Sequence, residues 1–79
     1  MEVPISKSTR VLIMQELFKK GIIINLENYA TDYHISNRTA IRDLDELRAF
    51  YSEMRALTGE SLDIVYDRDL RGYKLQRNL

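Results

Sequence analysis

The sequence predicts a small α+β fold that is mostly helical, with its elements in the order α-β-α-α-β-β. Two patterns carry this prediction. Up to about residue 55, apolar residues recur at three- and four-residue spacing, which indicates helices; after residue 60 they alternate with polar residues, which indicates strands. A chain of 79 residues suits one core, so we expect residues 1–79 to form a single domain.

The first two elements are expected to be a helix over about residues 8–20 and a short strand at residues 22–24. Val11, Met14, Leu17 and Phe18 lie on one face of the helix, and Gly21 is suited to end it. The three consecutive isoleucines that follow are β-branched and too few for a helix, which is typical of a short strand.

Two further helices follow, each with a capping residue at its start. Asn25 can cap a helix that runs through Tyr33, and Ser36 can cap a longer helix from residue 37 to about residue 55. We expect the apolar stripe of the longer helix to face the core. That stripe consists of Ala40, Ile41, Leu44, Leu47, Tyr51 and Met54.

The last predicted element is a hairpin, with strands at about residues 61–67 and 72–77 and a turn rich in Asp and Arg between them. The link at residues 33–36 has the length that joins two helices in a helix-turn-helix. A hairpin after these helices supplies a wing, and residues 22–24 can pair beside it as a third strand. The predicted architecture is therefore a winged helix-turn-helix.

Two motifs give the chain a resemblance to a known family. Residues 36–44, SNRTAIRDL, are similar to the S-x-R-T-I-x-R-D-L signature of DeoR-like winged-helix regulators, with Ala40 in the place of the isoleucine. Residues 72–75, GYKL, resemble the G-Y-x-L that ends the wing in that family. Over about residues 7–76 the chain is most similar to the N-terminal DNA-binding module of bacterial WYL-domain transcriptional regulators, without the effector-sensing domain of that family.

The resemblance implies sequence-specific binding of double-stranded DNA in bacterial or phage transcription control, in the cytoplasm. The third helix would enter the major groove from about residue 37, and the wing at about residues 67–72 would contact the backbone or the minor groove. Because one winged helix reads only a short site, we also expect the chain to pair, either as a homodimer on DNA or through a C-terminal effector domain. The alternative is a winged helix that serves as a protein-interaction module and binds no DNA.

The charge of the chain fits DNA binding only if it is unevenly distributed. Twelve basic and twelve acidic side chains give a net charge of zero, whereas chains that bind nucleic acid are often basic. Residues 3–15 carry +2, residues 36–42 carry +2 and residues 68–79 carry +3, so the remainder carries −7. These three segments would face the duplex together in a winged helix, which predicts a polarised surface.

The candidate DNA-contacting residues fall in the same three segments. Arginine can bind guanine, and asparagine adenine, through two hydrogen bonds, and the N–H groups of a helix start favour phosphate. The alternative is a capped surface helix and a turn whose charges are simply solvated. The candidates are Ser36, Asn37, Arg38, Thr39 and Arg42 in the third helix, Arg68 and Arg71 at the wing, and Lys7 and Arg10 in the first helix.

Other residues of the third helix have different expected roles. Asp43 is expected to be structural, either paired with a nearby arginine or accepting a backbone N–H. Asp45 and Glu46 are expected to mark where the helix leaves the groove. Phe50, beside Met54, is expected to form an exposed patch on a chain that is a monomer or a weak dimer by itself.

The sequence lacks the signatures of several function classes. It has no cysteine and a single histidine, His34, so neither a disulfide nor a metal cluster is expected. No apolar run approaches the ~18 residues of a membrane helix. No catalytic constellation and no phosphate-binding glycine loop is present. We therefore expect a protein that is not an enzyme, that needs no cofactor and that has no membrane partner.

Overall fold

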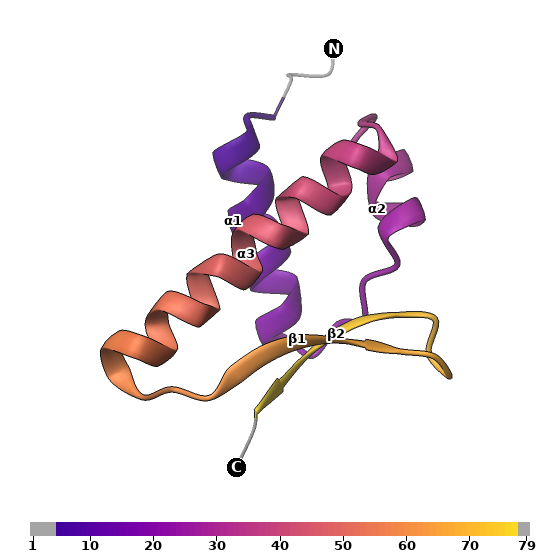
Figure 1. The fold of residues 1–79 in the computed structure, drawn as a ribbon. Helices are drawn as coiled ribbons and strands as arrows, with labels where there is room; N and C mark the ends of the chain where they lie inside the picture. The colour runs from indigo at the N-terminus through magenta and orange to yellow at the C-terminus, as the bar shows by residue number, and fades with distance from the viewer. Residues whose placement is uncertain (1–4, 78–79) are drawn as a thin grey trace.

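Three helices and an antiparallel hairpin make up the computed structural model, which describes residues 5–77. In Figure 1, α3 crosses in front of α1, α2 lies beside the first part of α3, and the turn of the hairpin lies on the α2 side. The predicted mostly helical α+β fold, with a winged-helix arrangement, is confirmed. The elements are α1 (Lys7–Lys19), α2 (Leu26–Asp32), α3 (Asn37–Thr58), β1 (Leu62–Asp67) and β2 (Gly72–Arg77).

Each helix begins at a side chain that caps it. Ser6, Asn25 and Ser36 precede α1, α2 and α3, and each side chain accepts a hydrogen bond from the backbone N–H three residues later. α3 continues three residues beyond its predicted end and stops at Gly59, whose φ of 78° is a left-handed conformation that glycine adopts without strain.

The hairpin pairs β1 with β2 in one register, from Leu62 opposite Arg77 to Asp67 opposite Gly72. Asp67 organises the turn because its carboxylate accepts the Leu70 N–H at 3.0 Å and the Lys74 ammonium at 3.1 Å. These two donors, with the backbone N–H first, lower the pKa of Asp67.

The predicted third strand is reduced to a single bridge. Only Ile24 pairs with the hairpin: its N–H donates to the Tyr73 carbonyl at 2.9 Å, and its carbonyl accepts the Tyr73 N–H at 2.7 Å. Asn25 then caps α2, so the extended segment ends there. The bridge brings the backbone so close to Gly72 that a Cβ there would lie 2.6 Å from Ile23 Cγ2.

The core lies where the three helices and the hairpin meet, and one prediction about it is wrong. Ile41 was expected to be buried, but its side chain is 49% exposed. Ala40 and Leu44 define the buried side of α3, and Ile41 is turned about 100° away from Ala40. The buried apolar residues are Met14, Phe18, Ile24, Tyr29, Ala30, Ala40, Leu44, Leu47, Tyr51 and Ile64.

The hairpin is fixed to the middle of α3 by Arg48. Its guanidinium donates to the Ile64 carbonyl at 3.1 Å and lies 5.2 Å from the centre of the Tyr73 ring. The wing is therefore held against the same helix that carries the predicted recognition residues. Among residues 5–77, no helix is both long and apolar enough to cross a membrane.

Candidate nucleic-acid interface

The first two turns of α3 bring five of the predicted contact residues together. Ser36 and Thr39 hold the start of the helix: the Ser36 hydroxyl accepts the Thr39 N–H at 3.0 Å and lies 3.0 Å from the Thr39 hydroxyl. Asn37, Arg38 and Arg42 are exposed. Because residues four apart lie on the same side of a helix, the Arg38 and Arg42 side chains share one face.

Arg10 does not belong to this interface, so the prediction that it contacts phosphate is wrong. Its side chain points into the core, where the residue is only 8% exposed. Arg10 Nε and Nη2 donate to the Asp43 carboxylate at 2.5 and 3.0 Å. Because two of its donors are held by a buried carboxylate and little of the residue reaches the surface, Arg10 is not displayed for a phosphate as Lys7 is.

The Asp43 carboxylate joins all three helices. Besides Arg10 of α1, it accepts a hydrogen bond from the Tyr29 hydroxyl of α2 at 2.9 Å. Asp43 is fully buried, so both partners are needed to offset the loss of its hydration. Its predicted structural role, as the partner of a nearby arginine, is confirmed.

The hydrogen bonds and the burial in this network shift the pKa values of Arg10 and Tyr29. The Asp43 hydrogen bond raises the pKa of Arg10, against the opposing effect of burial. Burial first, and then the same carboxylate, raises the pKa of Tyr29. Both groups therefore keep their protons near neutral pH, and the network keeps its donors.

A signal for the buried pair is present in the sequence. Arg10 lies four residues before Met14, on the apolar stripe of α1, and Asp43 lies between Ala40 and Leu47 on the stripe of α3. Opposite charges that interrupt two apolar stripes are expected to meet in the core, since a buried charge requires a partner.

Lys7 is accessible at the start of α1, as predicted for a phosphate contact. Its ammonium lies 3.6 Å from a Glu46 carboxylate oxygen, and both side chains are more than half exposed. An exposed ion pair of this kind contributes little and leaves Lys7 able to exchange Glu46 for another anion.

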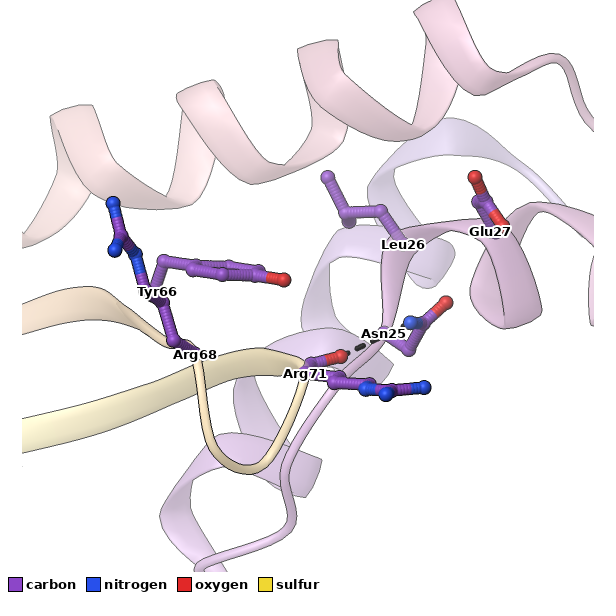
Figure 2. Close-up of a pocket in the computed structure, with 6 residues that line it drawn as sticks. All are labelled: Asn25, Leu26, Glu27, Tyr66, Arg68 and Arg71. Carbon is purple, nitrogen blue, oxygen red and sulfur yellow. Dashed lines mark hydrogen bonds between the residues drawn. The ribbon is translucent and has the colours of Figure 1, made fainter.

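The wing presents its two predicted arginines beside a hollow of about 580 Å³. Arg68 and Arg71 are exposed at the turn, and Arg71 has a φ of 54°. Figure 2 shows Tyr66 and Arg68 on the hairpin side of this hollow, and Asn25 and Glu27 on the α2 side. Both cations are therefore displayed where the hairpin turn and the start of α2 meet.

Asn25 fixes the wing turn to α2, a role beyond its predicted function as a cap. Its side-chain oxygen accepts the Asn28 N–H, while its side-chain nitrogen donates to the Arg71 carbonyl at 3.0 Å. Tyr66 was likewise not among the predicted site residues. It is exposed at the hollow, and its ring meets that of Tyr73 edge-on at 5.1 Å.

The predicted apolar patch lies between α1 and α3 and has a different composition. Phe50 is exposed as expected, whereas Met54 is half-buried. The second exposed apolar side chain of the patch is Leu12 of α1, and both line a groove of about 330 Å³. Lys7 and Glu46 lie at the same groove.

Within residues 5–77, no group of three His, Cys, Asp or Glu side chains could hold a metal ion. Of the predicted contact residues with a charged side chain, Arg38 and Arg42 are exposed near the start of α3, Lys7 at the start of α1, and Arg68 and Arg71 at the wing. No family model, curated protein or solved structure matches the chain, so its own geometry is the basis for assigning a function.

Proposed function

We propose that this chain is a sequence-specific double-stranded DNA-binding module of transcription control, of the DeoR-like winged-helix kind. The start of α3 would enter the major groove, and the wing would contact the backbone or the minor groove. The observation that carries the proposal is the exposure of Asn37, Arg38 and Arg42 on the first two turns of α3, while the buried side of the helix packs against α1, α2 and the hairpin.

The chemistry of these side chains matches the edges of base pairs. Arg38 and Arg42 can each donate two hydrogen bonds to a guanine, and Asn37 can pair with an adenine in the same way. Each such pair contributes about 1–3 kcal/mol of discrimination against the wrong base. The capped helix start holds these side chains on a rigid element, as base readout requires.

Phosphate contacts would come from Lys7, Arg68 and Arg71. Three neutralised phosphates predict that the logarithm of the association constant falls with the logarithm of the salt concentration with a slope of about −3. The exposed acids Asp45 and Glu46 follow the arginines on α3 and repel phosphate, so the footprint is expected to end there.

Selection of bound duplexes from a random DNA pool tests the proposal directly. We expect one preferred sequence, and Arg38→Ala and Arg42→Ala should each weaken binding to it by about 1–3 kcal/mol without unfolding the chain. Lys20→Ala is the matched control: it removes one exposed positive charge at the far end of α1 and should leave the affinity almost unchanged.

Two outcomes would contradict DNA recognition. One is a pool that yields no preferred sequence; the other is equal affinity for the wild-type chain and for both folded arginine variants.

The groove around Leu12 and Phe50 favours the alternative, a protein-interaction module. Binding through that apolar surface would show almost no dependence on salt, in contrast to the slope expected for DNA.

A further inference from the structure

Ile41 is an exposed apolar side chain whose exposed neighbours along the first turns of α3 are polar. It is 49% exposed, one helical turn from Asn37 and Arg38 and one turn from Asp45. The other large apolar residues that are exposed on α3 lie elsewhere: Phe50 is in the groove beside α1, and Leu57 is in the last turn. Ile41 alone among them shares its surroundings with the proposed base-reading residues.

The neighbours of Ile41 determine what can cover it. An apolar protein surface placed over Ile41 would also remove Arg38 and Arg42 from water without giving them partners, which is strongly unfavourable. The major-groove edge of DNA avoids this penalty because it offers many hydrogen-bond acceptors. It also carries one kind of apolar group, the C5-methyl group of thymine.

We propose that Ile41 determines specificity by packing against the C5-methyl group of a thymine in the major groove, an inference that rests on the proposed function. A β-branched side chain in a helix has essentially one χ1 rotamer, so the methyl groups of Ile41 are held in place before binding. Arg38 and Arg42 can then bind flanking guanines, so the start of α3 reads a thymine within a guanine-containing sequence.

Deoxyuridine provides the test, since it differs from thymidine only by the missing methyl group. In the duplex selected by the wild-type chain, each thymine is replaced in turn by uracil and the Kd is measured at fixed salt. We expect one replacement to weaken wild-type binding about fourfold, the change for losing the burial of one methyl group. Ile41→Ala should bind the thymine and uracil duplexes equally well.

Leu57→Ala is the matched control because it truncates an 80% exposed side chain in the last turn of α3. This variant should keep the wild-type preference for thymine. The inference is wrong if the chain selects a sequence but no uracil replacement weakens binding, or if Ile41→Ala keeps the thymine preference; the proposed function survives both results. If no sequence is selected, both the proposed function and the inference are wrong.

Discussion

At the scale of single residues, Tyr29 and Tyr51 allow a direct comparison. Both place a phenol ring in the core, but their hydroxyl groups differ in their partners. The Tyr29 hydroxyl donates to Asp43 at 2.9 Å. The Tyr51 hydroxyl is buried near Gln15 without meeting hydrogen-bond geometry within the described residues.

We therefore expect Tyr29→Phe to lower the free energy of unfolding by about 1–3 kcal/mol, because it removes a hydrogen bond to a buried charge. Tyr51→Phe is the control: it deletes a buried hydroxyl that meets no hydrogen-bond geometry within residues 5–77, and it should not lower the free energy of unfolding. Urea denaturation followed by circular dichroism measures both. Equal losses in the two variants would show that the Asp43 network does not stabilise the fold.

Arg10 and Asp43 also show where reading the sequence residue by residue fails. Neither residue is unusual in its local context, since a charge at a helix start and an acid on a long helix are both common. Their structural role is to pair with each other, although they are 33 positions apart in the chain. Asp43 was expected to pair with a nearby arginine or to accept a backbone N–H, but Arg10 was not identified as that arginine and was predicted to contact phosphate. The two apolar stripes, compared with each other, predict the pair.

At the scale of elements, the position of the wing depends on Gly72. A methyl group there would meet Ile23 Cγ2 at 2.6 Å and the Ile24 carbonyl oxygen at 2.9 Å. We expect Gly72→Ala to lower the free energy of unfolding by about 1–3 kcal/mol and to weaken DNA binding, because the bridge to the hairpin must shift.

Gly59→Ala is the control for that substitution. A methyl group at Gly59 meets nothing within 4 Å, so only its left-handed backbone is strained, at a cost of about 1 kcal/mol. Gly59 ends α3 far from the arginines of its first turns, and DNA affinity should stay as in the wild type. Equal losses of affinity in the two variants would disprove the special role of the bridge.

The wing arginines are expected to bind backbone rather than bases. Arg68→Ala and Arg71→Ala should each weaken binding to all sequences alike and flatten the salt dependence by about one unit. Arg77→Ala removes the same charge at the opposite end of the hairpin, where it pairs with Leu62, and serves as the control. If either wing variant changes the preferred sequence, the wing reads bases and the assignment is wrong.

At the scale of the whole molecule, the order of the elements was predictable because local signals marked it. The side chains of Asn25 and Ser36 cap the helices that they were expected to cap, and the hairpin has the predicted strands. The predicted third strand is longer than the single bridge that forms. β-branched residues favour extended backbone, but they do not determine how many residues pair with a neighbouring strand. Only Ile24 reaches Tyr73 before Asn25 begins the next helix.

The candidate site was less predictable than the fold. Asn37, Arg38 and Arg42 were identified from helix position, and the structure leaves them exposed. Ile41 was assigned to the core because the whole apolar stripe of α3 was treated as one face. That stripe spans too wide an arc to be buried completely, and Ile41 lies at its edge, about 100° from Ala40.

The groove around Leu12 and Phe50 bears on assembly. We expect the free chain to be a monomer or a weak dimer at tens of micromolar, because two exposed apolar side chains form only a small patch. Phe50→Ser should abolish any weak association seen by sedimentation. A tight dimer that persists in this variant would rule out both the weak pairing and the patch.

The double attachment of Asn25 has a mechanical consequence. A force applied to the wing tip passes through the Arg71 carbonyl to Asn25, and from Asn25 into α2, the helix that precedes the turn before α3. This hydrogen bond and the Ile24–Tyr73 bridge attach the wing to the segment that leads into α2. Under the proposed function, this attachment would set the spacing between the bases read by α3 and the phosphates held by the wing.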